Sequence, residues 1–310
     1  MKSEPRLAIL YGGVSAEREV SLGSGKAAAE SFSKFCEVDL IDVTDAALPA
    51  ALDPAKHIVF STLHGTFGED GQIQKLMEEA GIVYAGCDSK SSALTFDKVD
   101  TKEALRERGI SVCPEFAFEA EDSVDLDTLI SVVGEDVVIK PRRQGSSIGL
   151  AFAKTREEIE SAFSGIKEGP WVVEPRINGR ECTIGVVNGE VYEIVEIKPH
   201  SGTFDYQSKY TKGGTEYIAP AVMEIVLVNE VKKLALDTYR ACGCRDFARV
   251  DFMINEQGQP FVLEVNSLPG LKETSLLPMS AGAAGHNFDN LLRLLIEPAK
   301  QRFASKYSFC

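Results

Sequence analysis

Short apolar runs alternate with amphipathic stretches along the first third of the chain. The elements expected there are strands at 7–11, 37–43 and 57–63 and helices at 15–35 and 73–80. This alternation is typical of a parallel sheet with helices on its faces and with ligands at the carboxyl ends of the strands. We therefore predict an N-terminal α/β domain over residues 1–89.

The pattern changes in the middle of the chain, where the strands are shorter and glycine-rich turns connect them. One helix is expected over 91–109, followed by a strand, a glycine-rich loop and a second strand within 137–153. A helix at 156–163 and a strand at 171–174 then complete a small α+β unit. We predict that this unit is a central domain over residues 90–175.

Antiparallel signals dominate the last part of the chain, which we predict to be a C-terminal domain over residues 176–310. Strands at 182–187 and 191–197 flank an Asn-Gly pair, a strong hairpin signal. The polar and aromatic stretch at 200–214 is typical of a closing lid, with an ordinary surface loop as the alternative. The other elements expected are a helix at 228–242, a hairpin at 249–266 and a last helix at 287–296.

Composition and charge narrow the possible functions. The 310 residues are 44% hydrophobic and 26% charged, which excludes a disordered, collagen-like or coiled-coil chain. A formal net charge of −14 and the lack of an apolar run of about 20 residues predict no nucleic-acid and no membrane partner. Seven cysteines without a regular framework favour a reducing cytoplasm. Any phosphate must therefore bind in a local cationic pocket.

The hairpin at 249–266 carries the strongest chemical signal. Folding it about its middle places Asp251 near Glu264, and strand alternation places Asn266 on the same face as Glu264. Two neighbouring carboxylates repel each other unless a cation lies between them, and these oxygen ligands suit Mg²⁺. The alternative is an exposed acidic hairpin in an acidic protein.

A second candidate site is the glycine-rich loop at 145–149, which offers backbone N–H groups and the hydroxyls of Ser146 and Ser147 to an anion. Lys140, Arg142 and Arg143 precede it and predict a cationic pocket, although a simple hairpin turn is the alternative. The chain has no P-loop sequence.

Two further positions lie near the ends of predicted strands in the first domain. His64 begins a loop that contains three glycines and two carboxylates within 64–71, more than a connection requires. Glu17 lies near the start of the first helix, where an acid also simply complements the helix dipole. Both residues are therefore candidates for a ligand site, with a structural role as the alternative.

Seven motifs follow one another in a characteristic order. They are GGVSAEREVS at 12–21, HGTFGEDG at 64–71, DK at 97–98, KP at 140–141 with GSSIG at 145–149, KY at 209–210, RVD at 249–251 and EVNSLPG at 264–270. In this order they resemble the D-alanine–D-alanine ligase family over residues 7–297. The resemblance implies a three-domain ATP-grasp fold and the ligation of two D-alanines for peptidoglycan precursors, with release of ADP and phosphate. Joining a carboxylate to an amine in water is unfavourable, so activation as an acyl phosphate fits this reading.

The resemblance also implies a nucleotide and metal site. The metal would be Mg²⁺ or Mn²⁺, as two ions, held by Asp251, Glu264 and Asn266. The residues implied to bind ATP are Lys98, Lys140, Ser146, Ser147, Glu174, Pro175, Ile177, Glu181, Lys209 and Asn266. Among them, Glu174 to Ile177 match the adenine hinge and Glu181 matches the acid that binds ribose.

Roles toward the amino-acid substrates are likewise implied by the resemblance. Glu17 matches the acid that holds the first D-alanine ammonium, with His64 nearby. Arg249 and the Gly270 N–H match the groups that stabilise the oxyanion. The second carboxylate would bind Ser275 and Leu276, and Ser146, Tyr210 and Glu17 would form a hydrogen-bonded triad.

Four positions depart from the family pattern, and one of them, Lys272, bears on the identity of the second substrate. Gln144 replaces the usual glutamate before the glycine-rich loop. Pro175 lacks the backbone N–H that is usual in the hinge, and Leu271 and Lys272 replace the usual methionine and threonine beside the second-substrate site. The alternatives are a D-alanine–D-lactate ligase, which Tyr210 disfavours, a non-catalytic ATP-binding regulator, or an ATP-grasp ligase for a larger acid. A homodimer is expected from the resemblance alone.

Overall fold

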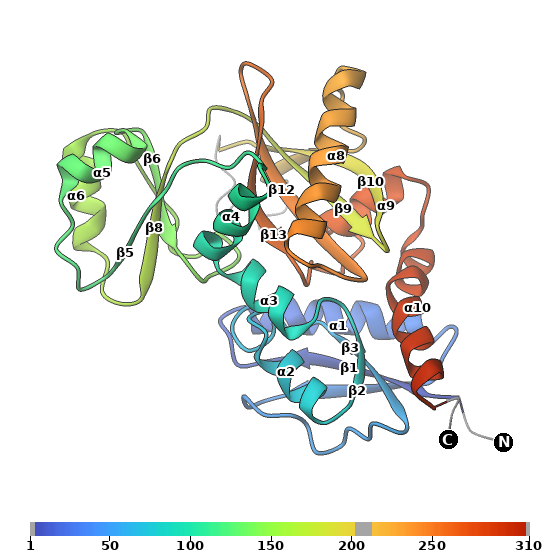
Figure 1. Ribbon diagram of the computed structural model, residues 1–310. Helices are drawn as coiled ribbons and strands as arrows, with labels where there is room; N and C mark the ends of the chain where they lie inside the picture. Colours follow the sequence, from blue (N-terminus) through green and yellow to red (C-terminus); the bar gives the residue numbers. More distant parts are fainter. Residues whose placement is uncertain (1–3, 202–212, 308–310) are drawn as a thin grey trace.

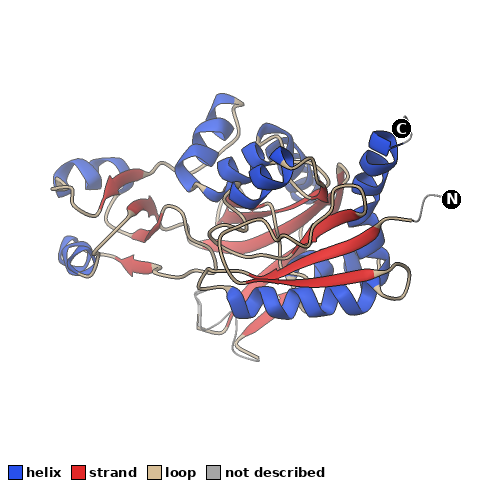
Figure 2. Cartoon of the chain, turned by 90° about the horizontal axis from the view of Figure 1, so that it is seen from below, coloured by secondary structure: helices blue, strands red, loops and turns tan. Residues whose placement is uncertain are grey.

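The computed structural model describes residues 4–201 and 213–307, and its strands form three separate sheets. Two sheets form the main body, while the third projects from one end with its own helices (Figures 1 and 2). In the described part of the chain, no helix is long and apolar enough to cross a membrane.

The first sheet is parallel and has the order β2-β1-β3-β4. Its strands are β1 (Arg6–Gly12), β2 (Val38–Val43), β3 (His57–Ser61) and β4 (Val83–Ala85), with helices α1 (Arg18–Phe32) and α2 (Gln72–Glu79). Every residue of β3 is buried, as expected for a central parallel strand that is covered on both faces. The predicted alternation of strands and helices is therefore confirmed in this region.

The last helix of the chain, α10 (Phe288–Tyr307), packs against this first sheet (Figure 1). Leu291, Leu295 and Phe303 share one apolar core with residues of β1 and β3. The predicted helix at 287–296 was too short, because α10 continues past Pro298. Proline costs helix stability, but burial of side chains on both sides of it outweighs that cost.

The single helix predicted over 91–109 is wrong. Two helices occupy this stretch, α3 (Ser89–Phe96) and α4 (Lys98–Glu107), and they meet at Asp97. Asp97 has an extended backbone (φ −96°, ψ 112°), and its carboxylate accepts hydrogen bonds from the N–H groups of Val99 and Asp100. The break therefore places a well-capped helix start, with Lys98 as its first residue, beside the site described below.

The projecting sheet is antiparallel and has the order β5-β8-β6-β7. Its strands are β5 (Phe116–Glu119), β6 (Val137–Pro141), β7 (Ala151–Ala153) and β8 (Pro170–Pro175), and α5 (Leu126–Val133) and α6 (Arg156–Ser164) complete the unit. An apolar core joins the two helices to the sheet through Leu129, Ile159 and Val173. The glycine-rich loop connects β6 to β7.

The third sheet is antiparallel and has the order β11-β10-β9-β12-β13. Its strands are β9 (Gly179–Val187), β10 (Glu190–Pro199), β11 (Thr215–Ile218), β12 (Phe247–Asn255) and β13 (Pro260–Asn266). Helix α8 (Ile225–Ala241) packs on the apolar face of this sheet, which contains Val250 and Phe252. Helix α9 (Leu276–Ala283) lies over Gly185 on the other face. Helix α9 was not predicted from the sequence. Because side chains alternate along a strand, Arg249 and Asp251 point to the α9 face.

Candidate active site

The β12–β13 hairpin brings its polar side chains together in the predicted way. Asp251 lies directly opposite Glu264, and Arg249 lies directly opposite Asn266. The register shifts just after Asp251, so that Phe252 pairs with Val262. The prediction that folding the hairpin places Asp251 beside Glu264 is therefore confirmed.

Asp251 is the centre of a hydrogen-bond network on this hairpin. Arg249 donates from Nε to Oδ1 at 2.9 Å and from Nη2 to Oδ2 at 2.8 Å. Asn266 donates from Nδ2 to Oδ2 at 3.0 Å, and the buried Thr183 hydroxyl donates to Oδ1. Burial alone would lower the pKa of Arg249, but Asp251 outweighs it and raises that pKa. Thr183 was not predicted, since only the pairing of β9 with β12 brings it to this position.

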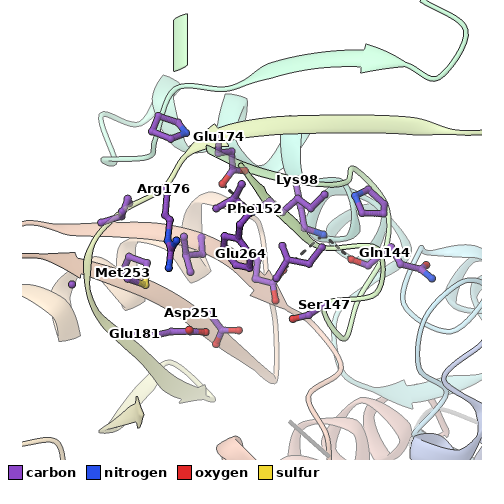
Figure 3. Close-up of a pocket in the computed structure, with 18 of the residues that line it drawn as sticks. Lys98, Gln144, Ser147, Phe152, Glu174, Arg176, Glu181, Asp251, Met253 and Glu264 are labelled. Atoms are coloured by element: carbon purple, nitrogen blue, oxygen red, sulfur yellow. Dashed lines mark hydrogen bonds and ion pairs between the residues drawn. The ribbon is translucent and has the colours of Figure 1, made fainter. Parts of the chain in front are cut away.

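A cavity between the projecting sheet and the hairpin collects most of the residues that were predicted to bind nucleotide (Figure 3). The predicted residues that line it are Lys98, Lys140, Ser147, Glu174, Pro175, Ile177, Glu181, Asp251 and Glu264. Phe152, Met253 and Leu263 add an apolar surface that sequence reasoning missed. The lining thus combines apolar side chains with lysines and carboxylates, a composition that fits a molecule with a flat ring and a phosphate tail.

Glu174 lies at the back of this cavity between two lysines. Its carboxylate is 2.9 Å from Lys140 Nζ and 2.7 Å from Lys102 Nζ, and Glu174 and Lys102 are almost completely buried. Burial alone would raise the pKa of Glu174, but Lys140 and Lys102 outweigh it and hold the pKa at about 2. Lys102 was not predicted, although it lies one helical turn after Lys98 and so shares its face of α4.

Lys98 connects helix α4 to the glycine-rich loop. Its Nζ donates to the Gln144 carbonyl at 2.7 Å and lies 3.8 Å from Glu264. The prediction that Arg142 and Arg143 form part of the cationic pocket is wrong, since each donates from Nε to Asp97 at 2.6 Å. These arginines anchor the start of the loop to the helix break, because Asp97 is buried and attracts both of them.

The glycine-rich loop lies between two cavities. Ser146 and Ser147 both have positive φ, 53° and 55°, a conformation that costs energy for a residue with a side chain. Ser147 lines the cavity with the lysines, whereas Ser146 lines a second one and donates a hydrogen bond to Glu17. The strained pair thus directs two successive hydroxyls into different sites.

The second cavity collects the residues that were predicted to bind amino acids. Those that line it are Glu17, His64, Ser146, Arg249, Gly270, Ser275 and Leu276. The predicted metal ligands Glu264 and Asn266 and the unpredicted Glu69 and Tyr217 line it as well. His64 Nε2 is 3.4 Å from the Ser24 hydroxyl, and its Nδ1 is 3.9 Å from Glu69. Lys209 and Tyr210 lie outside the described residues. Glu264 lines both cavities and therefore forms part of the boundary between them.

The hairpin supplies ligands that suit a hard divalent cation. Among the described residues, no cluster of three or more His, Cys, Asp or Glu side chains forms a metal site by itself. Asp251, Glu264 and Asn266 instead offer two carboxylates and one amide, a set that leaves further coordination positions for water or phosphate. These donors therefore fit Mg²⁺ or Mn²⁺ bound together with a phosphorylated ligand.

Comparison with known proteins identifies the family to which this site belongs. Two family models match the chain, described as D-ala D-ala ligase N-terminus over residues 36–87 and D-ala D-ala ligase C-terminus over residues 105–297. The chain belongs to the D-alanine–D-alanine ligase family. The D-alanine–D-alanine ligase of Methylacidiphilum infernorum is 40% identical over 294 residues, which are 94% of each chain. That of Syntrophotalea carbinolica is 40% identical over 306 residues, 96% of this chain and 97% of the relative.

Solved structures of D-alanine–D-alanine ligases and of a D-Ala:D-Ser ligase have the same architecture. The Bacillus anthracis enzyme complexed with ATP has a TM-score of 0.84 and 28% identity, with 97% of this chain and 99% of that one covered. The VanG D-Ala:D-Ser ligase of Enterococcus faecalis has a TM-score of 0.81 and 27% identity, with 96% of this chain and 100% of that one covered. The predicted ATP-grasp fold with an N-terminal parallel sheet is confirmed.

Proposed function

We propose that this chain joins two D-alanines to D-alanyl-D-alanine in the cytoplasm, using ATP, for peptidoglycan precursor synthesis. The observation that carries the proposal is that one hairpin lines two cavities, with Glu264 in both. A phosphate donor and an amino acid can therefore bind on either side of the same carboxylate. The names of the curated relatives and the ATP complex of the Bacillus anthracis enzyme support this assignment. The division into domains 1–89, 90–175 and 176–310 and a homodimeric state are part of the proposal.

We assign the cavity beside the projecting sheet to ATP. The adenine would lie between the apolar surface of Phe152 and Met253 and the hinge from Glu174 to Ile177. Because Pro175 has no N–H, adenine would contact its carbonyl or neighbouring groups of the hinge. Glu181 would bind the ribose, and the groups that would meet the phosphates are Lys98, Lys140, Ser147 and, from the lid, Lys209. The Ser146 hydroxyl, which the resemblance also assigned to ATP, lies in the amino-acid cavity instead.

We assign the metal to Asp251, Glu264 and Asn266, with two Mg²⁺ or Mn²⁺ ions as the expected number. When bound, a divalent cation neutralises charge on the phosphate oxygens and orients the transferred group. Arg249 and Asn266 hold the Asp251 carboxylate in place through the contacts described above. The chain itself therefore orients this ligand.

Glu264→Gln is expected to weaken Mn²⁺ binding in the presence of ATP about ten-fold or more, because the amide removes one negative charge from the metal face. The binding is measured directly from the electron paramagnetic resonance signal of free Mn²⁺. Glu256→Gln, an exposed acid at the tip of the same hairpin, is the matched control and should bind Mn²⁺ normally. Equal Mn²⁺ affinity in both variants would contradict the metal assignment.

We assign the second cavity to the two D-alanines. Glu17 would hold the ammonium of the first, whose carboxylate attacks the γ-phosphorus of ATP to give an acyl phosphate and ADP. The amine of the second D-alanine, after losing a proton, would attack the acyl carbon. Arg249 and the Gly270 N–H would stabilise the resulting oxyanion, which collapses with loss of phosphate. Ser275 and Leu276, at the start of α9, would bind the second carboxylate, since a helix N-terminus attracts anions.

Glu17→Gln is expected to raise the KM for the first D-alanine about ten-fold or more, because the neutral amide attracts the substrate ammonium less strongly. The measurement is the rate of phosphate release as a function of D-alanine concentration at saturating ATP. Glu19→Gln, two residues away and exposed, is the control. An unchanged KM for the first site in the Glu17 variant would show that the assignment is wrong.

The choice of second substrate is tested by a panel of acceptors. D-alanine, D-serine and D-lactate are compared at neutral pH for ATP-dependent product formation. We expect the dipeptide D-alanyl-D-alanine to predominate, in line with the names of the curated relatives. A preference for D-lactate or D-serine would instead assign the chain to a ligase with another acceptor, such as the D-Ala:D-Ser type represented among the similar structures. Good ATP binding without product from any acceptor would favour a non-catalytic regulator.

A further inference from the structure

Lys272 lies in the loop between β13 and α9, three positions before Ser275. The side chain of Lys272 lies against the backbone of α1 at Gly23. A Cβ atom at position 23 would meet Lys272 Cε at 2.3 Å and Nζ at 2.5 Å, closer than real contacts allow. Gly23 therefore leaves the space that the end of Lys272 fills.

Hydrogen bonds attach the same loop to both neighbouring helices. The Leu271 N–H donates to the Ser24 hydroxyl on α1 at 3.3 Å. The Lys272 N–H donates to Ser275 Oγ at 3.1 Å, and the Ser275 N–H donates to the Lys272 carbonyl at 2.7 Å. Lys272 therefore connects α1, through its side chain, to the first residues of α9, through its backbone.

The contact lies beside the amino-acid cavity. Val20 lines that cavity and lies one turn before Gly23 on the same face of α1. Ser275 and Leu276 line it from the start of α9. The spacing between α1 and α9 therefore decides where the N–H groups of the first turn of α9 lie relative to a bound carboxylate.

We propose that Lys272 is a positioning residue for the second substrate. The end of its side chain, at Cε and Nζ, lies over Gly23 and holds the loop at 270–275 against α1, which fixes the place of Ser275 and Leu276. This inference rests on the proposed function, because it assigns these two residues to the acceptor carboxylate. Loss of the contact between Lys272 and Gly23 is therefore expected to weaken binding of the acceptor and to leave ATP binding unaffected.

The test uses Lys272→Ala, Lys272→Met, Gly23→Ala and the double variant of Gly23→Ala with Lys272→Ala. We expect Lys272→Ala and Gly23→Ala each to raise the KM of the acceptor D-alanine about five-fold, with the KM for ATP unchanged within about two-fold. An alanine Cβ at position 23 displaces only the flexible end of Lys272 and suits a helix interior, so this variant should fold. Lys272→Met keeps the stem and should behave nearly like the unmodified chain.

The double variant separates packing from other effects. Both single changes remove one contact, so the double variant should have an acceptor KM no higher than that of Lys272→Ala. By the same reasoning, Gly23→Ala should raise the melting temperature more when residue 272 is already alanine, since no side chain then opposes the new Cβ.

Three results would overturn the inference. The first is an unchanged acceptor KM in Lys272→Ala. The second is a double variant in which the fold-increases of the acceptor KM in the two single variants multiply. The third is a Lys272→Met variant as impaired as Lys272→Ala, which would assign the effect to the charge. Failure of the proposed function is a different observation, since the unmodified chain would then release no phosphate in response to D-alanine. An active unmodified chain with unaltered variants would refute the positioning role alone.

Discussion

Replacing Arg249 with alanine is expected to lower the turnover number about 100-fold or more, because the guanidinium would stabilise charge that develops only in the transition state. The KM for ATP should stay within a factor of about two, since Arg249 lines the amino-acid cavity and is not among the residues that line the other one. Steady-state phosphate release at saturating D-alanine measures both quantities.

Arg249→Lys is the matched variant, because it keeps the positive charge and loses the planar pair of donors that meets Asp251. We expect it to retain more activity than the alanine variant but less than the unmodified chain. Mn²⁺ binding in both variants controls for disturbance of Asp251, which loses two hydrogen bonds in the alanine variant. A turnover number within about three-fold of normal in Arg249→Ala would contradict the assigned role.

Replacing Glu174 with glutamine is expected to destabilise the protein by about 3–5 kcal/mol, because two lysines then lie beside an uncharged group at a buried position. For a chain of this size the melting temperature should fall by about 10 °C. Thermal unfolding followed by circular dichroism measures the change. Glu168→Gln, an exposed acid just before the same strand, is the control and should melt normally.

A second substitution keeps this prediction falsifiable. Lys102→Met in the Glu174→Gln background removes one of the two lysine charges beside the amide, a charge that Glu115, 3.8 Å from Lys102 Nζ, compensates only in part, and should restore part of the lost stability. A melting temperature for Glu174→Gln within about 2 °C of normal would show that the lysines find other partners.

The same glutamate gives the folded protein a defined acid sensitivity. Its pKa is about 2 in the folded state against an ordinary value of 4.5, so its ion pairs stabilise the fold fully above about pH 4.5. That contribution is lost as the pH falls from 4.5 toward 2, because in this range the unfolded chain binds a proton at Glu174 and the folded protein does not. Urea unfolding across this range should show a smaller pH dependence for Glu174→Gln than for the unmodified chain.

Local patterns in the sequence predict the parts of this site that strand geometry determines. The alternation within one hairpin was enough to place Asp251 beside Glu264, because the turn and the strand period set the register. The resemblance then named residues on distant segments, and the structure brings Glu17, Ser146 and Arg249 around one cavity. Lys209 and Tyr210 remain predictions.

The remaining features depend on contacts between segments that are remote in sequence. Arg142 and Arg143, which lie more than forty positions later, bind Asp97 at the helix break. The helix propensities of the residues around Asp97 do not depend on these arginines and therefore do not report their contribution. Lys102 lies in a helix of mostly polar residues and looks solvent-exposed until Glu174 on β8 is placed next to it. Buried polar pairs of this kind are decided by tertiary packing, which a single sequence does not display.

The most direct test of the central claim follows the oxygen atoms of the first substrate. The unmodified chain is incubated with ATP, the metal and D-alanine that carries heavy oxygen in its carboxylate, and the inorganic phosphate is analysed by mass spectrometry. Activation as an acyl phosphate predicts that each phosphate released contains one heavy oxygen atom and that D-alanyl-D-alanine forms in equal amount. Unlabelled phosphate, or phosphate released without dipeptide, would contradict the account.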